Sequence, residues 1–196
     1  VVPVRGSGPD PSRQSSAHPH CVVPHPSNGR IYAADLGTDK LLELQLDRST
    51  GVLTIENEYP VAPGCGPRHL AFGASGRSAL VVGELTSRLG VWAVGSTGEL
   101  REQQDLPMLP KSSSARNNTG ADVVVCRDGS QAFASNRGHD SIAVYRADDD
   151  TFRLEQIVST SATPRGIALT DDDSHLLVAN QDADSVSVFE LREGGG

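Results

Sequence analysis

The sequence has few cysteines, no excess of positive charge and no long apolar run, and each absence excludes a class of protein. Hydrophobic residues make up 37% of the 196 residues, and no stretch approaches the roughly eighteen apolar residues of a membrane span. We therefore expect no membrane association. Lysine and arginine number 17 against 25 acidic residues, a net charge of −8, and no basic stripe occurs, so nucleic acid is not an expected partner.

The cysteines are too scattered to form a stabilising framework. Cys21, Cys65 and Cys126 are odd in number and never have Cys-x-x-Cys spacing, so neither a disulfide network nor a zinc site is predicted. Free thiols fit a reducing compartment, which predicts a cytoplasmic protein. No cluster of His, Asp and Glu with ligand spacing stands out, and we expect no metal and no other cofactor.

The first residues, VVPVRGSGP, also lack familiar features. They contain no initiating methionine, no basic segment and no apolar core of a signal peptide. We interpret this end as a cut into a longer protein.

An internal repeat is the main positive signal. Four segments share the order of short apolar strand, polar turn, second strand, polar loop and alternating third strand. Turn residues recur at intervals of 47, 53 and 44 residues, which is typical of four-stranded propeller blades. The sequence therefore predicts an all-β fold, a β-propeller of about four antiparallel blades that forms part of a larger ring. The single domain spans 1–196, with blade repeats near 20–67, 68–119, 120–164 and 165–194.

A β-sandwich is the alternative fold, but its strands rarely repeat at a fixed spacing with the same polar positions. No Gly-His and Trp-Asp pair occurs, so a standard WD40 disc is not expected. The stretches 54–61, 101–108 and 153–160 are polar enough to form outermost strands, whereas the last repeat has none. VVPV is too short to replace it, so closure by this chain alone is not expected.

Polar residues recur at two positions of the repeat. Within a blade the first strand is innermost and the second runs antiparallel to it, so the start of one and the end of the other lie near one mouth of the channel. We therefore predict one shared pocket. The residues entering the first strand are His20, Arg68 and Arg165, and those following the second are Leu36, Glu84, Arg137 and Gln181.

Other polar residues of the repeats have simpler explanations. Exposed arginines and glutamates usually only solvate a surface, and it is their recurrence in register that favours a site. Alternation along a strand would turn His69 away from the side of Arg68, so we expect His69 to be structural. The segment SSSARNNTG (112–120) is expected to be a mobile surface loop. Asx side chains that we expect to cap their own turns are Asp35, Asp39, Asn136, Asp140, Asn180 and Asp184.

Several motifs together resemble the lactonase family of seven-bladed propellers, which includes a 6-phosphogluconolactonase and a fungal 3-carboxy-cis,cis-muconate lactonizing enzyme. They are RQSSAHPHC, GPRHLAF, GELTS, SNRGHDSIAVY, TPRGIAL and LLVANQDADSVSVF. The resemblance covers nearly the whole chain and implies that about three N-terminal blades are missing. It also implies an active site of His20, Arg68, Glu84 and Arg137, the residues on which the repeats converge.

The resemblance and the residue types together predict a metal-free hydrolase that opens a sugar-acid lactone, as a 6-phosphogluconolactonase does. Glu84 or His20 would activate water, while Arg68 and Arg137 would hold the oxyanion. His18, Arg165 and Gln181 would bind the small-molecule lactone or anionic carboxylate substrate.

Three alternatives remain. The same residues suit the cyclisation of 3-carboxy-cis,cis-muconate, in which a carboxylate adds to an alkene. The stretch LLVANQDADSVSVFE also resembles the noncatalytic YVTN-type binding propellers. An opened propeller with part of its pocket missing would be an inert fragment.

Overall fold

The computed structural model describes residues 1–113 and 117–191, and its regular structure there consists of fifteen strands and one short 3-10 helix, η1 (Gln181–Ala183). The strands form four antiparallel sheets, which we call blades 1 to 4 in chain order. Blade 1 contains β1 (Pro19–Pro24), β2 (Ile31–Asp35), β3 (Lys40–Asp47) and β4 (Val52–Pro60). Blade 2 contains β5 (Pro67–Phe72), β6 (Ser78–Gly83), β7 (Arg88–Val94) and β8 (Leu100–Pro107). Blade 3 contains β9 (Thr119–Val125), β10 (Gln131–Arg137), β11 (Ser141–Asp148) and β12 (Thr151–Ser159), and blade 4 contains β13 (Pro164–Leu169), β14 (His175–Asn180) and β15 (Ser185–Glu190).

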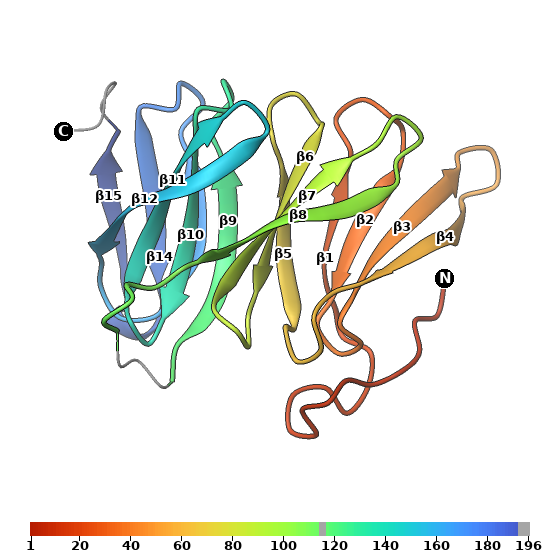
Figure 1. The fold of residues 1–196 in the computed structure, drawn as a ribbon, viewed down its shortest axis with the longest axis horizontal. Coiled ribbons are helices and arrows are strands. Elements are labelled where there is room, and N and C mark those ends of the chain that lie inside the picture. Colours follow the sequence, from red (N-terminus) through yellow and green to blue (C-terminus); the bar gives the residue numbers. More distant parts are fainter. Residues whose placement is uncertain (114–116, 192–196) are drawn as a thin grey trace.

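The blades stand side by side in chain order, from β1–β4 at one end to β13–β15 at the other (Figure 1). β5 contacts both β1 and β9, and β9 contacts β13, so the first strands of the four blades form one row. This arrangement confirms the predicted all-β propeller architecture. The outermost strands β4, β8 and β12 cover all but the last residue of each predicted polar stretch, and within the described residues blade 4 has three strands.

Apolar clusters fill each interface between neighbouring blades. Leu70, Val81 and Trp92 lie in the cluster between blades 1 and 2, and a second cluster around Leu80 and Tyr145 joins blades 2 and 3. A third cluster joins blades 3 and 4. Because both faces of β6 are covered, all its residues are buried, which explains the apolar run from Ala79 to Val82.

The two ends of the row have no neighbouring blade, and their valines are exposed. Val22 of β1 is 61% exposed, and Val186 and Val188 of β15 are 66% and 60% exposed. No helix in the described part of the chain is long and apolar enough to cross a membrane.

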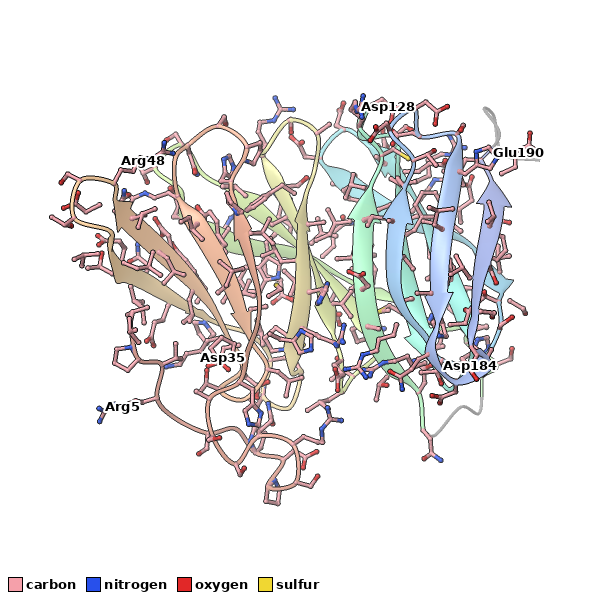
Figure 2. All side chains as sticks on the ribbon, turned by 180° about the vertical axis from the view of Figure 1, so that it is seen from behind. Arg5, Asp35, Arg48, Asp128, Asp184 and Glu190 are labelled. Atoms are coloured by element: carbon pink, nitrogen blue, oxygen red, sulfur yellow. The ribbon has the colours of Figure 1, made fainter. Side chains whose placement is uncertain are left out.

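The loops between the second and third strands are built on polar side chains, but the prediction that each one caps its own turn was wrong for Asp39, which binds the segment between β4 and β5. Asp39, Asp140 and Asp184 adopt positive φ angles of 54°, 53° and 47° at equivalent places. The buried carboxylate of Asp39 accepts hydrogen bonds from the backbone N–H groups of Gly64 and Gly66. Asp35 and Asp184 mark the lower rim in Figure 2, and Arg48, Asp128 and Glu190 mark the opposite one.

The segment predicted to be a mobile loop is partly built into the core. Residues 114–116 lie outside the described residues, as do 192–194 of the last predicted repeat. Asn118, however, is buried, and its side-chain nitrogen donates to Ser87 Oγ at 2.8 Å and to Asn136 Oδ1 at 3.0 Å. The prediction was therefore wrong for the end of this segment, where Thr119 and Gly120 begin β9. These long-range hydrogen bonds join blades 2 and 3. The composition of the segment alone could not predict them.

Candidate active site

An irregularity in the first strand of three blades falls on the cation-capable residue predicted from the repeats. The register shifts between Pro19 and Cys21 in β1, which makes His20 the extra residue. Equivalent shifts make Arg68 the extra residue of β5 and Arg165 that of β13. A β-bulge bends its strand and re-aims a side chain, and bulges are common beside active sites.

The strand registers in blades 3 and 2 correct two expectations that came from aligning the repeats. In blade 3, Gly120 pairs with Asn136, so Ala121, rather than Gly120, stands in the row of bulged residues. In blade 2, the bulge at Arg68 interrupts the alternation that was expected to turn His69 away. His69 instead lies against the ring of His20, with 5.2 Å between the ring centroids.

Glu84 is the centre of the site. It follows β6, is 2% exposed, and pairs with three arginines from separate parts of the chain. Oε1 accepts a hydrogen bond from Arg13 Nη2, and Oε2 lies 2.9 Å from both Arg68 Nε and Arg137 Nη2. Burial opposes ionisation, but the hydrogen bond from Arg13 and the charges of the three arginines outweigh it and lower the pKa of Glu84.

Arg68, which is buried, and Arg137, which is partly buried, are held from behind by backbone carbonyl groups. Arg68 Nη1 donates to Ala121 O at 2.6 Å, and Arg137 Nη2 donates to Gly120 O at 2.9 Å. Neither Nε atom has a well-aligned hydrogen bond to any described residue, although Arg68 Nε is in ion-pair contact with Glu84. Both guanidinium groups are therefore fixed in position while part of their hydrogen-bonding capacity stays unused.

Arg13 is the charged site residue that the sequence analysis did not predict, although it begins the motif RQSSAHPHC. It lies in the segment before β1, which loops beneath the lower edge of blade 1 (Figure 1), and so has no counterpart in the other repeats. The neighbouring Gln14 is fully buried and anchors this segment. Its side-chain nitrogen donates to Leu36 O at 2.9 Å and to Asp39 Oδ1 at 2.7 Å.

These residues surround a cavity of about 300 Å³ at the lower rim. Six of the seven residues predicted for catalysis or binding line it, and Gln181 holds one of them by accepting a hydrogen bond from Arg165 Nη1 at 2.8 Å. Four arginines and one glutamate give the lining a charge of +3 with neutral histidines, in a chain of net charge −8. The full lining is Ser12, Arg13, His18, His20, Leu36, Arg68, Glu84, Arg137 and Arg165.

His20 differs from the other ionisable groups of the cavity. Partial burial, the charge of Arg68 and the neighbouring His69 lower its pKa to about 4. Its imidazole is therefore neutral at neutral pH, with a lone pair available. Within residues 1–113 and 117–191, no group of three or more His, Cys, Asp or Glu side chains is arranged to hold a metal ion.

Comparison with known proteins identifies the family. The family model described as lactonase, 7-bladed β-propeller, matches residues 1–196. The chain belongs to this lactonase family. A 6-phosphogluconolactonase of Bacillus subtilis is 33% identical over 189 residues, covering 94% of this chain and 53% of the relative.

Solved structures of similar proteins agree with this assignment to the lactonase family. A protein from Lactobacillus plantarum superposes on 100% of this chain and 57% of its own, with a TM-score of 0.93 and 29% identity. The periplasmic gluconolactonase of Pseudomonas aeruginosa superposes on 93% of this chain and 52% of its own, with a TM-score of 0.86 and 28% identity. The chain thus spans about half the length of the relatives that it matches.

Proposed function

We propose that the protein is a hydrolase that opens a sugar-acid lactone carrying an anionic group, with 6-phosphogluconolactone as the substrate. The observation that carries this proposal is the cavity itself, which is lined by four arginines and a single carboxylate. Guanidinium groups pair with phosphate and carboxylate through two parallel hydrogen bonds. The names of the Bacillus and Pseudomonas relatives, a 6-phosphogluconolactonase and a gluconolactonase, support a lactone as the substrate class.

In the proposed reaction His20 is the base. Its neutral imidazole takes a proton from water while the water oxygen bonds to the lactone carbonyl carbon. Arg68 and Arg137 stabilise the oxyanion that forms on the carbonyl oxygen. The tetrahedral intermediate then collapses, the ring C–O bond breaks, and the protonated His20 returns its proton to the departing ring oxygen, which leaves a hydroxy acid.

Glu84 has a different role in this proposal. Both of its oxygens are engaged by arginines and its pKa is lowered, so it is a poor proton acceptor. We therefore assign it the positioning of Arg13, Arg68 and Arg137.

The deciding experiment is hydrolysis of 6-phosphogluconolactone by the full-length protein, wild type against Arg68→Ala. Losing one oxyanion donor costs about 3 kcal/mol, or roughly a hundredfold in kcat. Arg146→Ala is the matched control, because Arg146 is ion-paired with Glu155 and lies away from the cavity. An unchanged rate in Arg68→Ala would contradict the assigned role, and an inactive wild type would contradict the substrate.

Cyclisation of 3-carboxy-cis,cis-muconate is the second candidate. Its support is the number of arginines in the cavity, since a tricarboxylate would engage several of them. Lactone formation from that compound, with no hydrolysis of 6-phosphogluconolactone, would favour it, and binding without turnover of either compound would favour a YVTN-type binding propeller. We also propose a cytoplasmic location, which the free thiols of Cys21, Cys65 and Cys126 support.

A further inference from the structure

Asp122 of β9 connects three blades at the inner row of strands. Its Oδ1 lies 2.5 Å from His69 Nδ1 of blade 2 and also accepts a hydrogen bond from Val123 N at 2.9 Å. Its Oδ2 accepts one from Ile167 N of blade 4 at 3.0 Å. Burial opposes its ionisation, but these hydrogen bonds and His69 lower the pKa of Asp122. The carboxylate is therefore charged and fixed in position from three sides.

This carboxylate fixes the orientation of the His69 ring. When a histidine donates Nδ1–H to a carboxylate, the ring is held in one orientation and the neutral form carries its lone pair on Nε2. The side chain of His69 is 31% exposed, and Nε2 has no hydrogen-bond partner among the described residues. Its ring meets that of His20 at an interplanar angle of 58°. The fixed His69 ring therefore packs against one side of the His20 ring.

His20 has no other support of this kind. Its imidazole makes no hydrogen bond to residues 1–113 or 117–191. Within these residues, its ring packs against the ring of His69. A base on a bulged strand end with no orienting hydrogen bond would otherwise sample several rotamers. The charged and titratable groups that act on it are Arg68, His69, Glu84 and Arg165.

We infer that His69, fixed by Asp122, is a positioning residue that holds the imidazole of His20 in the orientation needed to accept a proton. The inference rests on the proposed lactonase function and adds two residues to its site. His69 acts through His20 and need not contact the substrate. The electrostatic effect of His69 is also one of the causes that lower the pKa of His20.

The test compares wild type, His69→Gln and Asp122→Asn in the full-length protein with 6-phosphogluconolactone. Loss of an orienting residue of this kind typically costs tenfold to a hundredfold in activity, and we expect about tenfold in kcat with little change in KM. The acid limb of the pH profile of kcat/KM should also move to higher pH in His69→Gln, because the pKa of His20 rises when the electrostatic effect of His69 and the burial by its ring are removed. His175→Gln is the matched control, since His175 bonds to Ser174 Oγ at 2.7 Å and does not line the cavity.

A second measurement does not depend on activity. NMR titration of His20 should give a higher pKa in His69→Gln than in wild type and no change in His175→Gln. If both the rate and the titration of His20 stayed as in wild type while thermal stability fell, the pair would be only a tie between blades and the inference would be wrong. A wild type inactive on the lactone would overturn the proposed function instead, and the titration would still decide whether His69 acts on His20.

Discussion

Glu84 shows what a single buried carboxylate does when three arginines share it. Arg13 reaches it from the segment before β1, Arg68 from blade 2 and Arg137 from blade 3. Removing one member of a buried ion pair leaves the others uncompensated, which costs far more than breaking an exposed pair. The same contacts that form the site therefore also join its parts.

We expect Glu84→Gln to lower the free energy of unfolding by about 3 kcal/mol at pH 7, measured by chemical denaturation. The pKa of Glu84 is lower in the folded state than its ordinary value of 4.5, so its stabilisation is present above about pH 4.5 and lost as pH falls through the folded pKa. The difference between the two proteins should thus shrink in acid. Glu155→Gln, which breaks more exposed pairs with Arg146 and Arg153, should cost about 1 kcal/mol or less. Equal losses in the two variants would contradict the central role of Glu84.

At the scale of elements, the segment before β1 lies so close to blade 1 that one glycine is required. A Cβ on Gly37 would stand 1.9 Å from Ser16 O and 2.7 Å from His18 N, both backbone atoms. Closer to the N-terminus, Gln14 holds the segment to Leu36 and Asp39 through its side chain. The position of Arg13 in the cavity thus depends on backbone packing next to it.

We expect Gly37→Ala to displace this segment, because a clash with backbone cannot be relieved by a rotamer change. Overpacking of this kind costs about 1–3 kcal/mol. Hydrogen exchange of residues 8–18 should become faster, and KM should rise as Arg13 and His18 leave the cavity. Gly166→Ala is the control, since a Cβ there would meet nothing within 4 Å. Unchanged exchange in Gly37→Ala would show that the segment is held by other contacts.

At the scale of the whole molecule, charge is divided unevenly. The chain carries −8 overall, whereas the cavity lining carries +3. An anionic substrate would therefore be repelled by the net charge of this chain and attracted by the arginines of the cavity. Added salt screens both effects, and within a Debye length of about 10 Å at 0.1 M the nearby arginines dominate.

We expect KM for 6-phosphogluconolactone to rise a few-fold between about 0.02 and 0.3 M NaCl while kcat changes little. A neutral gluconolactone should show a much smaller change, because it lacks the charged group. Equal salt dependence for the two lactones would mean that the arginines do not recognise the anionic group.

The predictions from sequence that succeeded concern strands and turns, which are determined by the pattern of neighbouring residues. Alternation of apolar and polar side chains shows where strands lie, and turn-forming residues such as Gly29 and Asp173 mark the turns between them. Repetition of that pattern was sufficient for the propeller and for the rows containing His20, Arg68 and Glu84. It was sufficient because the blades share one fold, so a given position of the repeat lies at the same place in each blade.

Tertiary structure alone decided the contacts that break this repetition. Arg13 precedes the first repeat, and the bulge at Arg68 turns His69 against His20, contrary to simple alternation. The hydrogen bond between His69 and Asp122 joins residues 53 positions apart on different blades. Such contacts depend on how separate sheets pack against each other. The identity of a side chain and the pattern of its sequence neighbours do not determine which residue of another sheet it contacts.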